Sequence, residues 1–195
     1  MRKYRDCLVV AMMAGALLFT GCSDKDPEVE ANEDFECRIA GALAPTWTCG
    51  SSNIDGYITA VGSAPLSKIG HGFSRREALA NGRSNLSQQI ETLVKDKVET
   101  FARSTGIGGD EVADKVSTQV SKQVAKVTLK GSKQIKYWEN PSNSDIYLLV
   151  SISQGELNQE IKNQVVSSYK NSDALWQQFQ SKNALESLEK EFQSQ

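Results

Sequence analysis

Few side chains in this 195-residue sequence have types and spacing that could do chemistry: four cysteines and a single histidine. His71 lies between Gly70 and Gly72, with no nucleophile or carboxylate close to it in the sequence. A catalytic histidine needs such a partner. The sequence also lacks a glycine-rich phosphate loop, a Gly-x-Ser-x-Gly elbow and a His-Glu-x-x-His motif. We therefore expect no catalytic residue, no metal site, no cofactor and no enzymatic activity.

Cys22 follows a segment typical of exported bacterial proteins. Met1–Asp6 is basic, and Cys7–Phe19 is an unbroken apolar and small-residue run that suits a signal peptide and is too short to span a bilayer. The run ends in Leu18-Phe19-Thr20-Gly21-Cys22, which resembles the bacterial lipobox, with Phe19 where Leu is usual. The resemblance implies that residues 1–21 are removed and that Cys22 carries diacylglycerol and a palmitate-like acyl chain. The alternative is a plain secretory signal with an incidental cysteine.

The residues after Cys22 indicate which membrane holds the protein and how the domain is connected to it. Ser23 stands where Asp would favour retention in the inner membrane, so known sorting rules imply the outer membrane, on its periplasmic or its surface side. Residues 22–34 comprise the acylated cysteine and a segment with six acids, one base and almost no apolar side chains. Such a segment cannot bury enough surface to order itself, so we expect a flexible acidic tether.

Cys37 and Cys49 are the only cysteines left once Cys7 departs with the signal peptide and Cys22 is acylated. In an oxidising compartment a disulfide is the default, and closing this short loop is worth about 3 kcal/mol. Free buried thiols are the alternative. Two cysteines twelve residues apart form neither a Cys-x-x-Cys redox motif nor a metal site.

The charge balance argues against nucleic acid as a partner. Arg2, Lys3 and Arg5 against Asp6 give residues 1–21 a charge of +2, so the remainder of a chain with formal charge −2 carries −4. A nucleic-acid-binding protein needs a concentrated basic face.

Hydrophobic periodicity indicates a strand at residues 56–63 followed by two helices. Ser74 and Glu77 form a capping-box pattern for a helix that runs to about Arg103. Asp110 can cap the second helix, which has valines at four-residue steps.

A β-hairpin is expected next. Around Ala125 the apolar period changes to two, which predicts a long strand to Trp138 with one wet face. The turn at Asn140-Pro141 leads into a second strand at residues 146–152. The wet face would display Lys126, Lys130 and Lys136, with Lys115, Lys122 and Lys133 nearby. These lysines suggest either contact with an anionic surface or a solvated, guarded sheet edge.

Two more helices complete the chain. Ser153 and Glu156 form a second capping box, and a last helix spans roughly residues 172–192. The order strand-helix-helix-strand-strand-helix-helix predicts an α+β fold, a small antiparallel sheet with its helices packed on one face. We expect an α+β domain at residues 35–170, containing the Cys37–Cys49 loop, and an amphipathic C-terminal helix at 171–195.

A family resemblance covers roughly residues 44–165. The chain resembles the twenty-kilodalton bacterial lipoprotein family, whose members are outer-membrane lipoproteins. One branch includes the flagellar assembly lipoprotein of the basal disk and ring, and the flagellar T protein has a similar domain. The resemblance is carried by Ala44-Pro45-Thr46-Trp47, Gly56-Tyr57, Ala60–Ala64, Glu77–Leu86 (with Gly82 where Ala is common), Trp138 and Ile146–Val150.

The resemblance implies an outer-membrane-anchored structural or assembly lipoprotein, in its most specific form a component of a flagellum-associated ring or disk. Expected partners are the outer membrane, copies of the chain along free sheet edges, and flagellar basal-body proteins. Trp176 and Phe179 could dock a partner or pack on the chain's own domain. The alternative function is an envelope module that binds a ligand or glycan.

Overall fold

The computed structural model describes residues 36–50 and 52–192. The signal segment, Cys22 and the predicted tether lie outside these residues. The elements are β1 (Arg38–Ile39), β2 (Ala42–Leu43), the 3-10 helix η1 (Thr46–Cys49), β3 (Tyr57–Ala64), α1 (His71–Thr105), α2 (Gly109–Gly131), β4 (Lys133–Glu139), β5 (Ile146–Ser153), α3 (Gln154–Lys170), α4 (Asp173–Ser181) and α5 (Ala184–Glu191).

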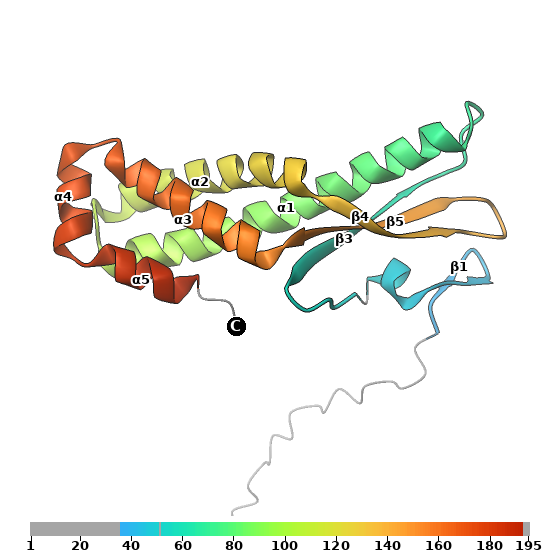
Figure 1. The fold of residues 1–195 in the computed structure, drawn as a ribbon, viewed down its shortest axis with the longest axis horizontal. Helices are drawn as coiled ribbons and strands as arrows, with labels where there is room; N and C mark the ends of the chain where they lie inside the picture. The colour runs from blue at the N-terminus through green and yellow to red at the C-terminus, as the bar shows by residue number, and fades with distance from the viewer. Residues whose placement is uncertain (1–35, 51, 193–195) are drawn as a thin grey trace, which may run out of the picture. The chain divides into compact units, whose positions relative to one another are not determined.

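The main sheet has three antiparallel strands in the order β3-β5-β4 (Figure 1). The predicted hairpin of β4 and β5 is confirmed, and the fold is α+β as predicted. Ala64 pairs with Ile146, which pairs with Glu139, so these three residues mark one end of the sheet. The apolar run of β5 lies in the centre and is buried on both faces, which explains why its sequence is continuously apolar rather than alternating.

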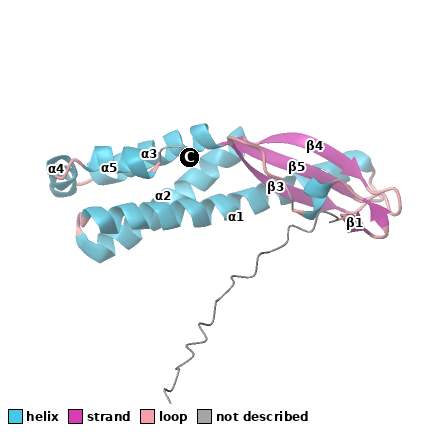
Figure 2. Cartoon of the chain, turned by 90° about the horizontal axis from the view of Figure 1, so that it is seen from below, coloured by secondary structure: helices cyan, strands magenta, loops and turns pink. Residues whose placement is uncertain are grey.

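Helix α1 owes its two packing partners to the spacing of its buried residues. These recur every four residues, at Ser74, Ala78, Gly82, Leu86, Ile90, Val94, Val98 and Ala102. Because a turn takes 3.6 residues, a four-residue step advances this stripe by about 40° each time. The first half of α1 therefore packs on β3 and β5, and the second half turns towards the other helices (Figure 2).

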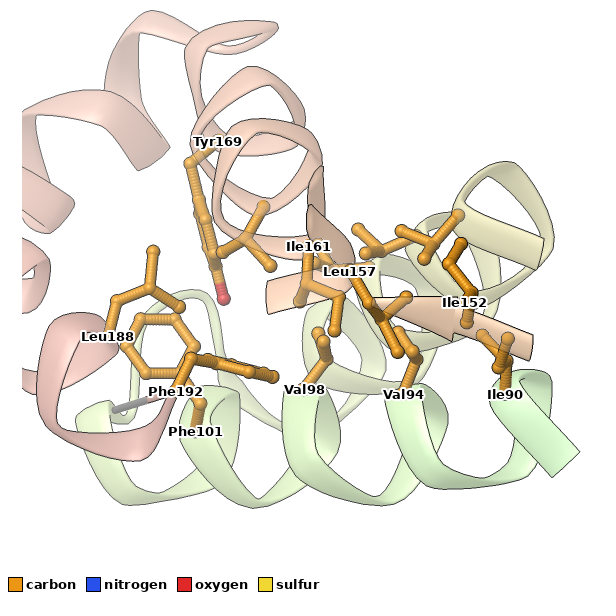
Figure 3. Packing of buried hydrophobic residues seen from close by; sticks show 14 of the residues in the cluster. Ile90, Val94, Val98, Phe101, Ile152, Leu157, Ile161, Tyr169, Leu188 and Phe192 are labelled. Atoms are coloured by element: carbon orange, nitrogen blue, oxygen red, sulfur yellow. The ribbon is translucent and has the colours of Figure 1, made fainter. Parts of the chain in front are cut away.

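The helices beyond α1 form a bundle that extends from the end of the sheet (Figures 1 and 2). α2 packs along α1, α3 packs on α2, and α5 returns to α1. Their apolar stripes share one core with the α1 stripe (Figure 3). Of the five α-helices, α1 thus supplies nearly all the helical cover of the sheet.

The centre of the sheet face opposite α1 is covered, contrary to the predicted wet face, whereas Lys136 at the β4 edge of that face is exposed as predicted. The disulfide-linked segment places η1 against β5, so Trp47 is buried and Leu149 is fully buried. Asn140, also fully buried, donates from Nδ2 to the carbonyl of Ile39 at 3.0 Å and fastens β1 to the β4–β5 turn.

The predicted strand from Ala125 to Trp138 is wrong over its first half. α2 continues to Gly131, because Val120, Val124 and Thr128 extend its buried four-residue stripe. The hydroxyl of Thr128 donates to the Val124 carbonyl at 2.6 Å, which satisfies a buried polar group inside the helix.

The predicted single helix at 172–192 is also wrong. The helix is interrupted at Asn183, whose φ of 49° lies in the left-handed region. The break separates α4 from α5, so that α5 can fold back onto α1. Asparagine tolerates this conformation better than most residues.

Candidate functional site

The predicted disulfide between Cys37 and Cys49 is present, with the two Cα atoms 6.0 Å apart. Cys37 is buried. The bond closes the segment that covers the second face of the sheet, so its role is to hold η1 in place. The predicted lipid site, Cys22, lies outside the described residues.

His71 is the first residue of α1, and its imidazole is exposed to solvent. Its Nδ1 lies 3.8 Å from Glu139 Oε2, beyond hydrogen-bonding distance. Within residues 36–50 and 52–192, no three His, Cys, Asp or Glu side chains gather closely enough to hold a metal ion. The pair is a surface contact between α1 and β4.

The predicted capping box at Ser74 is wrong, and the Ser74 hydroxyl instead binds the loop before the helix. α1 begins a turn earlier, after Gly70. Ser74 is fully buried, and its Oγ accepts the backbone N–H of Ser67 at 2.7 Å. The hydroxyl therefore fixes the loop before the helix. The second capping box is confirmed at its serine, since Ser153 Oγ accepts the N–H of Glu156 at 3.4 Å.

The predicted lysine face is not formed. Lys126 and Lys130 lie on α2, whereas Lys136 lies on β4. Lys122, Lys126 and Lys130 form an exposed row along one side of α2, because residues four apart share a helix face.

The outer edge of β3 is closed by two asparagines that the sequence analysis did not single out. Ser63 donates its N–H to Asn81 Oδ1 at 3.1 Å, and Asn85 Nδ2 donates to the Val61 carbonyl at 2.8 Å. An edge strand normally presents such groups to other chains. Their only signal in the sequence is a pair of asparagines four residues apart on a helix that follows a strand.

The opposite edge, β4, is interrupted instead of capped. Its register shifts between Gln134 and Lys136, and Lys133 and Lys136 are exposed there. Bulges and lysines are both common ways of discouraging edge pairing. Both edges of the three-stranded sheet thus carry features that discourage pairing with another strand, although the sequence suggested assembly along free sheet edges.

An open apolar hollow of about 550 Å³ lies between α4 and α5. Phe179 is buried in the chain's own core, as one of the two predicted alternatives held, and Trp176 stacks on it at 5.3 Å between ring centroids. Lys170 Nζ lies over the Trp176 ring, 4.9 Å from its centroid. The hollow is lined by Trp176, Phe179, Gln180, Asn183, Ala184, Leu185, Glu186 and Glu189.

Lys182 holds this end of the chain against α1. Its Nζ donates to the carbonyls of Thr105 and Gly106, at 2.7 and 3.2 Å. These carbonyls have no partner further along the helix, and a cation suits the negative end of its dipole. The hollow is therefore positioned by the C-terminus of α1.

A second, polar groove of about 450 Å³ lies between the disulfide segment, β3 and α1. Its polar side chains are carboxamides and hydroxyls, and no charged side chain lines it. The lining residues are Thr48, Cys49, Gly50, Ser52, Thr59, Ala60, Val61, Asn85, Gln88 and Gln89. Ser52 and Thr59 already bond to each other at 2.8 Å. Gln88 and Gln89 are exposed on α1 and supply donors and acceptors to the opening.

The fold and these sites define a small α+β module with a disulfide-held segment over the sheet and open recesses on its surface. The family model of the LPP20 lipoprotein matches residues 45–153, more than half of the chain. The chain belongs to this family, and is accordingly a membrane-anchored lipoprotein of the cell envelope. A search of curated proteins finds no match.

The matched region runs from just before η1 to the end of β5. All the residues that line the polar groove lie within the matched region. The residues that line the apolar hollow all lie beyond it, in α4, α5 and the link between them. Among the described residues, no helix is both long and apolar enough to cross a bilayer.

Proposed function

We propose that this protein is an outer-membrane lipoprotein, anchored by acyl chains on Cys22, that acts without catalysis by holding a folded module at the membrane. Membership of the LPP20 lipoprotein family is the observation that carries this proposal. The lipobox-like Leu18–Cys22 supplies the acylation site, and Ser23 after it favours the outer membrane.

The anchor is tested by Cys22→Ser in cells fed labelled palmitate. The wild type takes up label and fractionates with the outer membrane on a density gradient. The variant takes up none and accumulates as precursor or soluble protein. Label retained by the variant would contradict the anchor, and wild-type protein in the inner-membrane fraction would contradict only the location.

We further propose that the module assembles, with copies of itself or with envelope partners, through the hollow between α4 and α5. Leu185 lines it and is 54% exposed, which suits an apolar contact. In its most specific form this assembly is a ring or disk around the flagellar basal body.

Sedimentation of the acylated protein in detergent, over a concentration series, tests the assembly. Leu185→Asp should weaken association, whereas Val127→Asp, at a similarly exposed site on α2, should not. Equal behaviour of both variants would contradict a role for the hollow. A deletion strain that swims normally would contradict the flagellar form alone.

A second candidate function is favoured by the polar groove. A neutral recess lined by carboxamides and hydroxyls suits a hydroxyl-rich, uncharged ligand such as a glycan. Pull-down on purified cell-wall glycan, with Gln88→Ala and Gln89→Ala as the variants and Gln123→Ala on α2 as the control, tests it. Binding that survives the paired variants would exclude the groove.

A further inference from the structure

One end of the sheet gathers several chain segments. β3 ends there at Ala64 and leads through residues 65–70 into α1, and the β4–β5 turn lies at the same end of the sheet (Figure 1). The bond from Asn140 to Ile39 adds the β1–β2 hairpin to the same end. We call the loop 65–70, the first residues of α1 and the β1–β2 hairpin the sheet tip.

The loop of the sheet tip is held by its own hydrogen bonds in a form that leaves its apolar side chains outside. Ser67 Oγ accepts the N–H of Ile69 at 3.2 Å, and the Ser67 carbonyl accepts that of Gly70 at 2.9 Å. Gly70 has a φ of 108°, which glycine adopts without strain. Leu66 is 42% exposed and Ile69 is 77% exposed, the largest exposure among the big apolar side chains of the described residues.

Basic residues flank these two side chains. From residue 65 to residue 76 the chain carries Lys68, Arg75 and Arg76 and no acid. Lys68 and Arg76 are exposed and form no ion pair with another described residue. Leu43 on the hairpin, 61% exposed, adds a third apolar side chain to this end.

Three acids that lie near the sheet tip form contacts with their neighbours. Glu36 pairs with Arg38 at 2.8 Å, and Glu139 accepts from the Tyr137 hydroxyl at 2.9 Å. Asp145 accepts from Asn143 Nδ2 at 2.8 Å. Glu139 and Asp145 keep their negative charge in these hydrogen bonds to neutral groups, and Glu77, the next residue of α1, is exposed. Within residues 65–76 themselves the side-chain charge is positive.

The anchored end of the chain arrives at the same place. Glu36 is two residues before β1, and thirteen residues separate it from Cys22. Even fully extended, a segment of this length spans at most about 50 Å. Among the described parts of the protein, the β1–β2 hairpin of the sheet tip is thus separated from the anchor by the fewest residues.

We propose that the sheet tip docks on the anionic phospholipid surface to which the chain is anchored, with Leu66 and Ile69 inserted at the headgroup boundary and Lys68 and Arg76 against lipid phosphates. Exposed aliphatic side chains beside lysine and arginine bind membranes in this way. The inference rests on the proposed anchor at Cys22 and adds a second, non-covalent contact to it.

The test uses the acylated full-length protein in vesicles of phosphatidylethanolamine and phosphatidylglycerol. With Cys22 acylated and Cys37 joined to Cys49, Ile69→Cys introduces the one free thiol, which is labelled with an environment-sensitive fluorophore. Val127→Cys is the matched control, an exposed aliphatic site on α2. Flotation of the vesicles reports the anchor independently.

At position 69 the emission should shift to shorter wavelength and be quenched by nitroxide-labelled lipid, and at position 127 it should do neither. Adding Lys68→Glu and Arg76→Glu should reduce the quenching at 69, and so should vesicles of phosphatidylcholine alone. Protein that floats but stays unquenched at 69, or is quenched equally at both sites, would overturn docking while leaving the anchor intact. Protein that fails to float would overturn both.

Discussion

Gly62 of β3 and Gly82 of α1 lie with their backbones in direct contact. A β-carbon on Gly62 would lie 2.2 Å from the backbone nitrogen of Gly82, and equally close to the carbonyl oxygen of Ala78. The contact lets α1 approach the sheet closely enough for Asn81 and Asn85 to reach the backbone of β3. Packing therefore requires glycine at both positions, Gly62 in the strand and Gly82 in the helix.

Gly62→Ala should destabilise the protein by at least about 3 kcal/mol, because the added carbon meets backbone atoms that cannot move aside. Gly72→Ala is the control: Gly72 lies in α1, and a β-carbon there would meet nothing within 4 Å. That variant should be neutral or gain up to about 1 kcal/mol from helix propensity. Urea unfolding measures both, and equal stabilities would refute the close-contact explanation.

Replacing Asn81 and Asn85 together by alanine should open the edge of β3. Two hydrogen bonds of about 1 kcal/mol each are lost, partly offset by the better helix propensity of alanine. We expect a net loss of about 1 kcal/mol and, on warming, faster association through the exposed strand. Thermal melts with light scattering check this against Ser84→Ala, an exposed site between them, which should behave as wild type.

Loss of the Cys37–Cys49 bond should cost about 3 kcal/mol, from the entropy of a thirteen-residue loop. It should also loosen η1 over Leu149, which hydrogen exchange of β5 would report. The paired variant Cys37→Ala with Cys49→Ala should match reduced wild type, and a reductant should not change it further. A variant as stable as the oxidised protein would show that packing alone holds the segment.

Tyr169 is fully buried in the helical core, and its hydroxyl has no hydrogen-bond partner among the described atoms. Burial raises the pKa of Tyr169 to about 12. Tyr169→Phe should therefore stabilise the protein by about 1 kcal/mol at neutral pH, because it removes an unsatisfied polar group.

The same residue predicts a pH dependence. In the unfolded chain the phenol ionises near pH 10, whereas in the folded protein its pKa is about 12, so the unfolded state loses its proton first. Stability contributed by the neutral phenol is complete below pH 10 and falls as pH rises towards 12. The advantage of Tyr169→Phe should grow by about 1.4 kcal/mol between pH 8 and pH 11. Parallel unfolding free energies for the two proteins over this range would contradict the raised pKa.

Local signals were sufficient for some elements and misleading for others. Alternation and the Asn140-Pro141 turn predicted the hairpin, since strand period and turn chemistry are both local. Lysines alternating with Val127 and Leu129 imitate a strand, but the four-residue step to the buried Thr128 keeps the segment helical.

The recesses and edge caps were not predictable in the same way. The disulfide followed from counting cysteines, because only one pair was available. The groove beside Gln88, the hollow beside Leu185 and the bonds of Asn85 depend on segments distant in sequence that meet only after folding. Periodicity places a residue on a helix face but does not tell which neighbour that face will meet.

The length of α1 separates two kinds of contact. The helix begins at the sheet tip and ends where Lys182 binds the Thr105 carbonyl, and its 35 residues span roughly 50 Å. A molecule seated on a bilayer by its tip would thus offer the hollow at a stand-off of up to that distance, beyond the reach of partners lying flat on the same leaflet. α1, α2 and α3 together set this distance, and removing matched turns from all three would lower the height at which a partner is met while leaving the contacts at each end in place.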